Sequence, residues 1–421
     1  MYLSIANFLA ASASVFFVFV LVNAHTPEPD TIFPFNPGFN IQKVSSQASI
    51  LPSHSWEYGT ASEALLELYN RSLSVFGCNP FPPGPGPESL ASGGGVPGLE
   101  YASQKIVIGD PPNGLADGDG AVGDPASLGV SAVMLGLEYA DAARREVEYL
   151  VEGAPRWENG AISHRVEAPE LWADFVYMAP PFIAYYGVVH SDFGLLQEAV
   201  RQCGLYREVL RDRKRNVWEH IVGPTHPDPG LWSTGNAWAA AGMTRVLATV
   251  VKAPHQVVSS EDWREDTVGQ VSSWIKEIVD GAMESPMDGG LLRNYLNDTD
   301  DDGHGYGEIS GTSLLGAVVY RMAVLQPRVF GGKSSRYIRW ADGIRKTLGG
   351  RDDEGKPHVT EAGIVTPAVN PLDWGDTVPF TSGSPEGQNF VVLLYAAWRD
   401  CVWSGQCTDS EGHTQADTDR C

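Results

Sequence analysis

Apolar residues recur at helical spacing along most of the chain beyond residue 120. Val130, Val133, Met134 and Leu137 stand at positions i, i+3, i+4 and i+7, which places them on one face of an amphipathic helix. Clusters of Gly, Pro, Asn and Asp separate such stretches and supply turn-forming residues. The pattern predicts helices over residues 61–75, 126–140, 169–186, 193–211, 235–251, 261–283, 308–325, 334–348 and 387–399.

Strand signals are few, and the strongest covers residues 105–108. Short apolar helices that follow one another as hairpins favour a stack or a closed ring of helix pairs. A chain of 421 residues has room for two or three domains, but a barrel of this length also folds as one unit. The pattern therefore predicts an all-α protein with one large domain.

The first 24 residues carry no charge, and Phe16 to Val22 form a dense apolar run. Val22, Asn23 and Ala24 then offer the geometry of a cleavage site, so residues 1–24 are predicted to be a secretory signal peptide. Because no Lys or Arg precedes the apolar run, an uncleaved anchor helix is the alternative. We then expect an N-terminal extension over 25–60, the barrel over 61–401 with a Pro/Gly-rich insertion at 79–98, and a polar tail over 402–421.

Sequons and cysteines agree with secretion. Asn70 and Asn297 each begin an Asn-x-Ser/Thr acceptor sequence. Five cysteines follow the predicted signal, and an oxidising compartment allows up to two disulfides and one remaining thiol. Cys401 and Cys407 are close enough in sequence to close a short loop. We therefore expect a secreted protein that is glycosylated at Asn70 and Asn297.

The charge balance excludes two classes of partner. Lys and Arg total 29 against 52 for Asp and Glu, which gives a net charge of −23. A nucleic-acid binder needs a basic footprint, and a polybasic protein of the membrane surface needs one too. Twelve Trp residues are compatible with stacking on sugar rings, but ordinary cores use Trp as well.

Two motifs suggest ligand binding, but their surroundings do not support it. Gly118 to Gly123 match the G-x-G-x-x-G pattern, yet no strand directly precedes them and nearby Asp side chains would repel a pyrophosphate. The segment from Asp298 opens like a calcium loop, but its twelfth position is Ile309 in place of a bidentate Glu. The cysteines lack zinc-site spacing. We expect neither a metal nor a cofactor.

Asp174 is a single carboxylate within an apolar and aromatic stretch, residues 171–182. On the predicted helix, Glu170, Asp174 and Met178 share a face. Removing a carboxylate from water raises its pKa, and a general acid that works near neutral pH needs such a shift. The alternative is a structural Asp that caps a helix or pairs with Arg165.

Polar and aromatic residues also gather where other helices are predicted to begin. The segments 231–238, 306–312 and 384–390 each combine them with a Gly at a helix start. In an α/α barrel such helix ends can line one mouth, where helix dipoles and side chains converge on a ligand. Glu308 and Glu386, at two of these starts, equally complement the dipole alone.

The stretch LWADFVYMAPPF, residues 171–182, resembles the W-x-D-x-x-x-M-x-x-P-F core of the unsaturated glucuronyl and rhamnogalacturonyl hydrolases, glycoside hydrolase families 88 and 105. The resemblance runs from about residue 118 to residue 398. LWSTGNAW is similar to the family's W-A-R-G-N-G-W, and YGEISGTS to its E-x-S-x-T helix start. Further matched positions are Asp124 with Gly129, His164, Gln202 and His220.

The resemblance implies an (α/α)6 barrel of six helical hairpins. It also implies an oligosaccharide substrate whose non-reducing end is a 4,5-unsaturated uronic acid. Asp174 would donate a proton to C4 and activate water for attack at C5, and the resulting hemiketal would collapse; Asp124 would position water or substrate. The residues implied to bind substrate are His164, Trp172, His220, Trp232, Thr234, Asn236 and Trp238.

The sequence departs from the family pattern at the second motif. Thr234 stands where the family has Arg, which would serve as a bidentate partner of a uronate, and Ala237 replaces a Gly. Two other functions therefore stay open. One is a conventional inverting α/α-barrel glycosidase that uses Asp174 with Glu308 or Asp124, and the other is an inactive carbohydrate-binding relative.

Overall fold

The computed structural model describes residues 32–81, 95–110, 112–117, 119–300, 303–332 and 334–413. The predicted signal peptide lies outside the described residues, as do most of the Pro/Gly-rich insertion and the end of the tail. In these ranges, no helix is long and apolar enough to cross a bilayer.

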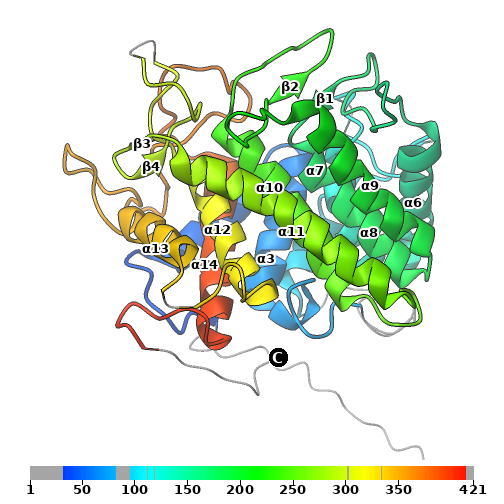
Figure 1. Cartoon of the computed structure of the whole chain (residues 1–421), viewed down its shortest axis with the longest axis horizontal. Helices are drawn as coiled ribbons and strands as arrows, with labels where there is room; N and C mark the ends of the chain where they lie inside the picture. The colour runs from blue at the N-terminus through cyan, green and yellow to red at the C-terminus, as the bar shows by residue number, and fades with distance from the viewer. Residues whose placement is uncertain are drawn as a thin grey trace, which may run out of the picture.

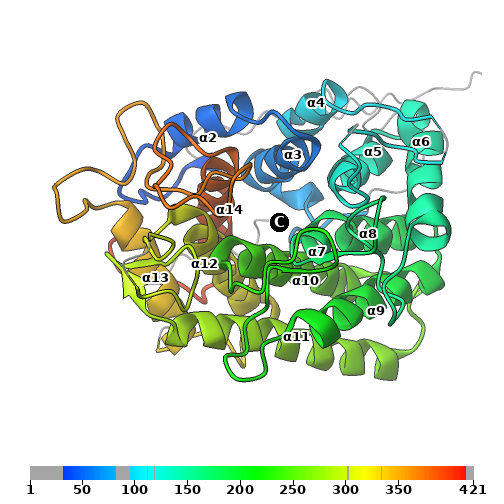
Figure 2. The same cartoon turned by 90° about the horizontal axis from the view of Figure 1, so that it is seen from above.

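Helices form two concentric rings (Figure 2). The inner ring consists of α3 (Ser55–Tyr69), α5 (Gly129–Leu135), α7 (Phe175–Met178) with α8 (Pro180–Val189), α10 (Ser233–Lys252), α12 (Ile309–Leu325) and α14 (Pro385–Trp403). The outer ring consists of α2 (Ile41–Ile50), α4 (Pro97–Ser103), α6 (Leu137–Glu148), α9 (Phe193–Leu210), α11 (Glu261–Glu284) and α13 (Arg336–Leu348). The predicted all-α fold, an (α/α)6 barrel of six helical hairpins, is confirmed.

Burial explains why the inner helices lack a polar face. Every residue of α10 from Ser233 to Val250 is buried, because the helix contacts α12 on one side, α7 and α8 on the other, and α11 outside. Trp238, which is fully buried, fills the space between inner helices, and the equally buried Trp398 packs outward against Phe35 and Arg345 of α13. Outer helices such as α13 bury one stripe and expose the rest.

Two predicted helices are interrupted. The helix expected over 126–140 is divided into a short 3-10 turn (Asp124–Leu128), α5 and α6, because Gly136 adopts a positive φ of 68° between the last two. The helix expected over 169–186 instead begins with strand β1 (Leu171–Trp172) and is broken again before Pro180.

Strands are short and lie on loops at one end of the barrel (Figure 1). Strand β1 pairs antiparallel with β2 (Ile221–Val222), and β3 (Met287–Asp288) pairs with β4 (Leu291–Leu292). The strand predicted at residues 105–108 was wrong, because this segment forms only an isolated bridge from Ile108 to Leu115.

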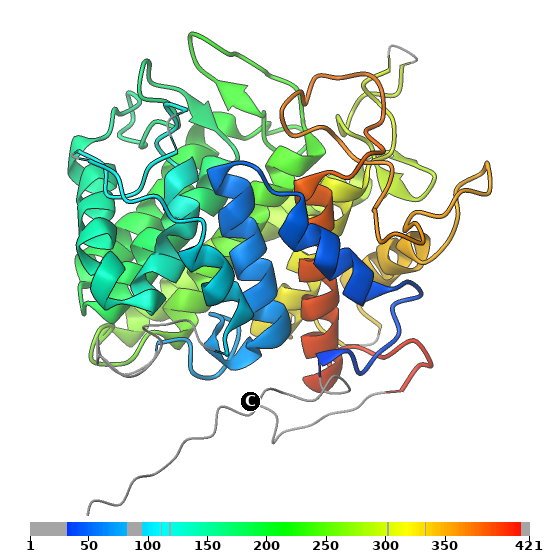
Figure 3. The same ribbon diagram turned by 180° about the vertical axis from the view of Figure 1, so that it is seen from behind.

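The barrel begins earlier than the predicted boundary at residue 61. Helices α2 and α3 both start within the segment expected to be an extension, and α2 packs on α14 and α3 (Figure 3). The ring closes here, because α3, the first inner helix, contacts α14, the last one, and α2 covers α14 from outside.

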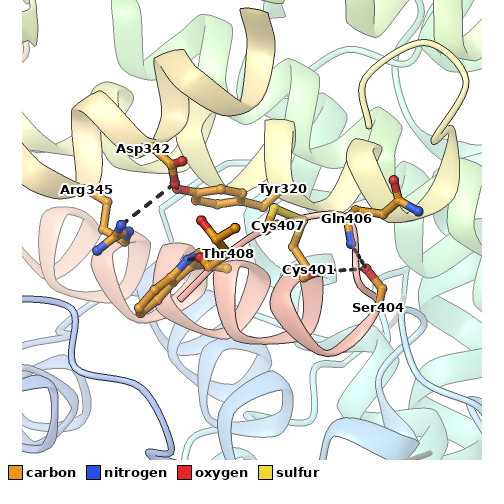
Figure 4. The surroundings of a disulfide bond; sticks show 9 residues. Tyr320, Asp342, Arg345, Cys401, Ser404, Gln406, Cys407 and Thr408 are labelled. Atoms are coloured by element: carbon orange, nitrogen blue, oxygen red, sulfur yellow. Dashed lines mark hydrogen bonds and ion pairs between the residues drawn. A yellow bond between two sulfur atoms is a disulfide. The ribbon is translucent and has the colours of Figure 1, made fainter. Parts of the chain in front are cut away.

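The C-terminal end of α14 is fixed by a disulfide between Cys401 and Cys407 (Figure 4). Trp398 on the same helix donates a hydrogen bond from Nε1 to the carbonyl oxygen of Thr408 at 3.1 Å. Cys78 is also disulfide-bonded, and Cys203 is a buried free thiol.

Candidate active site

A pocket of about 280 Å³ opens where the inner helices begin. Its walls come from the first turns of α3, α7 and α14, from the 3-10 turn before α5, and from the loops that precede α7, α10 and α14. The gathering of helix N-termini at one mouth therefore positions the site. The lining residues that carry chemistry are His54, Trp56, Asp119, Asp124, His164, Arg165, Trp172, Asp174, His220, Trp232, Trp374 and Glu386.

Asp174 lies just before α7, and not inside a helix as predicted. Its side chain is 14% exposed, and its Oδ2 atom is 3.4 Å from Nε2 of His220. In the described part of the chain, Oδ2 has no hydrogen-bond partner. Hydrogen bonds of Arg165 go elsewhere, to Asp119, so the alternative of a structural Asp174–Arg165 pair is not what the structure shows.

His220 stands between two carboxylates. Its Nδ1 atom is 2.9 Å from Oδ2 of Asp228, and that oxygen also accepts a hydrogen bond from the Tyr295 hydroxyl at 2.8 Å. Burial by itself would lower the pKa of His220, but Asp174 and Asp228 attract the proton and raise that pKa above its ordinary value. The imidazole is therefore oriented by Asp228 while its other nitrogen faces Asp174.

Asp124 and His164 form a second pair on the pocket wall. Oδ1 of Asp124 is 3.7 Å from Nε2 of His164, whose backbone carbonyl accepts from Val122. Burial, with Asp117 and Asp174 as further negative charges, raises the pKa of Asp124 well above its ordinary range. Burial lowers the pKa of His164 to about 4, so this imidazole is neutral at neutral pH. The surroundings of Asp124 thus favour the protonated form of its carboxyl.

Aromatic rings enclose the carboxyls. Trp172 stacks on His164 with ring centres 4.7 Å apart, and Trp374 meets Trp172 edge-on at 5.3 Å. Trp232 lies 4.4 Å from His220 and is fixed by a hydrogen bond from its Nε1 atom to Asn294. Flat apolar surfaces beside polar groups suit the two faces of a sugar ring.

Glu386 extends the acidic wall at the start of α14. Its Oε1 atom accepts a hydrogen bond from Nε1 of Trp56 at 3.1 Å. Burial, together with the charges of Asp174 and Glu57, raises the pKa of Glu386 well above the ordinary range. The pocket therefore contains two carboxyls with raised pKa values, Asp124 and Glu386.

Three predicted substrate-binding residues lie outside the pocket lining. Thr234 is fully buried beside Glu308, Asn236 bonds the backbone of Trp218 and Trp232, and Trp238 packs between Tyr177 and Phe390. Because α10 is buried on every side, only Trp232, which precedes it, reaches the mouth. The geometry gives a packing role to the other three.

Glu308 is also structural in this arrangement. Its side chain caps α12 by accepting from the backbone of Ser310 and Gly311, and from the Ser233 hydroxyl. Gln202, matched as a polar landmark, accepts from Ile162 and holds the loop before His164.

Sequence reasoning missed His54, Trp56 and Trp374 as parts of the site. His54 and Trp56 mark the start of α3, where the same concentration of polar and aromatic residues at a helix start was available as a signal. Trp374 lies in the long loop before α14, which has no periodicity to read. Its backbone carbonyl accepts from Asn294, which ties that loop to Trp232.

Solved structures of the same architecture define the class of this fold. A possible member of family GH105 from Salmonella enterica has a TM-score of 0.62 at 13% identity, over 86% of this chain and 92% of that one. The unsaturated glucuronyl hydrolase of Bacillus sp. GL1 has a TM-score of 0.53 at 14% identity, over 85% and 94%. The barrel is thus that of the six-hairpin glycosidases.

Two sequence comparisons match the central part of the chain. The model of Glycosyl Hydrolase Family 88 matches residues 136–326. The unsaturated rhamnogalacturonyl hydrolase YesR of Bacillus subtilis is 29% identical over 121 residues, which are 27% of this chain and 35% of that protein. The chain thus matches about a third of that relative's length. The predicted resemblance is confirmed, and the matched model and relative are both hydrolases by name, which agrees with the prediction of a glycoside hydrolase.

Proposed function

We propose that this protein removes a 4,5-unsaturated uronic acid from the non-reducing end of an oligosaccharide by hydration of its vinyl ether. One observation carries the proposal: Asp174, Asp124 and two oriented imidazoles converge in a pocket walled by Trp rings, and the family 88 match covers three of these four groups. The names of the matched relatives, unsaturated rhamnogalacturonyl and glucuronyl hydrolases, agree with this substrate class.

The proposed reaction needs two proton transfers, one to C4 and one from the water that attacks C5. Asp174 donates a proton to C4 of the double bond, and its carboxylate then takes a proton from the water that attacks C5. The hemiketal formed at C5 opens by cleavage of the bond from C5 to the ring oxygen, which leaves a ketone at C5 and a hemiacetal at C1. The hemiacetal then collapses: the bond from C1 to the glycosidic oxygen breaks, an aldehyde remains at C1, and the departing sugar leaves as an alcohol. Asp174 returns to its starting protonation state.

Neighbouring groups divide the remaining tasks. His220, held by Asp228, faces Asp174 and orients it for the transfer. Asp124, whose pKa is raised by burial, holds a proton and donates a hydrogen bond to substrate or water. Trp172, Trp232 and Trp374 pack against the sugar rings.

The test follows the ultraviolet absorbance of the double bond in lyase-generated disaccharides. The purified protein is expected to remove this absorbance, and Asp174→Asn to lower kcat by about 10²- to 10⁴-fold, the usual contribution of a general acid or base. Asp141→Asn, on the exposed face of α6, is the matched control and leaves kcat unchanged.

Other outcomes separate the alternatives. Hydrolysis of saturated oligosaccharides with an unchanged chromophore would identify a conventional glycosidase that uses Asp174 and Asp124 as its acid and base. Binding of the disaccharide without any turnover would identify an inactive carbohydrate-binding relative. Either result contradicts the proposal.

We also propose that the protein is secreted and glycosylated. The Cys401–Cys407 disulfide and the disulfide at Cys78 support an oxidising compartment. Asn297 is exposed, whereas Asn70 is partly buried and its amide nitrogen donates to Gly95, so Asn297 is the more accessible acceptor. Expression in a secreting eukaryotic cell tests this: glycosidase treatment should shift the mobility of the secreted protein, and Asn297→Gln should remove most of that shift. Retention in the cell without glycan would contradict the proposal.

A further inference from the structure

The acidic pocket presents a problem for an anionic substrate. Asp119, Asp124, Asp174 and Glu386 all line it, and a uronic acid adds another carboxylate. Such a ligand needs a positive partner, since an unpaired buried charge is costly. Thr234, at the position where the resembled family has Arg, is buried away from the pocket and supplies none.

Arg165 is the one Arg or Lys among the described residues that line this pocket. Its side chain is 21% exposed and forms part of the pocket lining. Nε is buried and has no hydrogen-bond partner within the described ranges. Nη2 donates to the carbonyl oxygen of Asp119 at 2.8 Å and lies 3.6 Å from Glu167, a carboxylate exposed to solvent.

The backbone holds this side chain in a defined place. Arg165 forms a β-bridge with Ala121, and Val166 donates to the carbonyl oxygen of Gly120 at 3.0 Å. A Cβ atom on Gly120 would lie 3.3 Å from Nη2 of Arg165, and the φ of Gly120 is +72°, a conformation that favours glycine. The absence of a side chain on Gly120 therefore leaves room for the guanidinium of Arg165.

We infer that Arg165 is the residue that binds the carboxylate of the unsaturated uronic acid and so determines specificity for a charged sugar. A guanidinium with an open donor edge is the group best suited to pair with a carboxylate. In this chain the cation comes from the loop that carries His164, and not from the start of α10. The inference rests on the proposed function, because it concerns the same substrate.

The experiment compares a 4,5-unsaturated uronyl disaccharide with its methyl ester, which has the same double bond but no charge. The wild-type protein should prefer the acid. Arg165→Gln should raise KM for the acid by about 10- to 100-fold, the cost of losing a hydrogen bond to a charged group, and change KM for the ester little. Arg165→Lys should recover part of the preference.

Matched controls exclude a merely structural effect. Arg144→Gln removes one positive charge from the exposed side of α6 and should leave both substrates unaffected. A loss of kcat shared equally by acid and ester would show that Arg165 only supports the fold or the proton of Asp124, and would overturn the inference. Equal use of acid and ester by the wild-type protein would also overturn it. If the wild-type protein consumes neither, the proposed function itself fails.

Discussion

Buried charges at the two ends of the inner ring are arranged in opposite ways. At the far end, near the C-termini of the inner helices, Arg245 pairs with Glu63 at 3.0 Å, and Arg321 pairs with Glu67 and Asp400 at 2.5 Å each. The space between them is only about 20 Å³, roughly that of one water. Every charge there has an opposite partner.

At the mouth, carboxyls face a pocket more than ten times larger and are short of cations. Asp124 and Glu386 have pKa values raised by burial, and Oδ2 of Asp174 has no hydrogen-bond partner among the described residues. The difference teaches that buried charge alone does not mark a functional site. The paired charges at the far end hold the helices together, whereas the incompletely paired carboxyls at the mouth can interact with a ligand.

The largest expected effect comes from the mouth. Asp124→Asn should lower kcat on unsaturated disaccharides by about 10²-fold or more, because a carboxyl that holds a proton beside the reacting centre is lost. The melting temperature should change little, since no packing atom is removed. A variant that keeps full activity would remove Asp124 from the reaction.

At the far end, the same kind of change should act on stability instead. Arg321→Met leaves Glu67 and Asp400 buried without this partner, which costs about 3–5 kcal/mol of unfolding free energy. Urea denaturation measures the loss, and kcat per folded molecule should stay near the wild-type value. Arg144→Met, which breaks exposed pairs, should cost about 1 kcal/mol or less.

The free energy of unfolding should also depend on pH, because Glu67 at the far end titrates differently in the folded and unfolded chain. Burial raises the pKa of Glu67 from 4.5 to about 7, against the opposing charge of Arg321. Between these values the folded chain holds a proton that the unfolded chain has released, so the unfolding free energy falls as pH rises from about 4.5 to about 7. Glu146 adds a slope of the same sign. Glu67→Gln should reduce the slope seen in urea denaturation at several pH values, and an unchanged slope contradicts this assignment.

A smaller effect, on KM, is expected from Trp374 on the loop before α14. Trp374→Ala removes the ring that faces Trp172 and His220, and should raise KM about 2- to 10-fold with kcat nearly unchanged. Val378→Ala, on the same loop but exposed and outside this pocket, is the matched control. If both variants behave alike, the ring is not part of the substrate site.

The subtlest test concerns the charge that surrounds Asp124. Asp117 helps to raise the pKa of Asp124, so Asp117→Asn should lower that pKa. A reaction that needs the protonated carboxyl is lost as pH rises through this pKa, and the alkaline limb of kcat against pH should therefore move to lower pH, by less than about one unit. A limb that moves upward or not at all would argue against a proton on Asp124.

The helical spacing of apolar residues predicted most helices. This spacing reflects which side chains are buried, and the helices of both rings have buried side chains. It failed where single residues override the pattern, at Gly136 and before Pro180. It also joined Asp174 to a helix, whereas the residue precedes α7.

The site was predictable where short motifs carry the chemistry. Asp174, Asp124, His164 and His220 stand in such motifs, and the structure brings them to one pocket. A motif does not determine where each of its side chains points, however. Thr234, Asn236 and Trp238 belong to the same motif as Trp232, but they pack among the helices. Trp374 was beyond reach, because a residue in an irregular loop is positioned by long-range contacts alone.

All inner helices begin at the same end of the barrel, so the loops that precede them meet there. These loops can vary in sequence, whereas the packed helices cannot. The loops that enter these helices carry the chemistry, while the helices themselves are packed on every side. New substrate preferences can therefore arise, in evolution or in the laboratory, by exchange of the segments before α5, α7, α10 and α14. The helical frame needs no redesign to carry them.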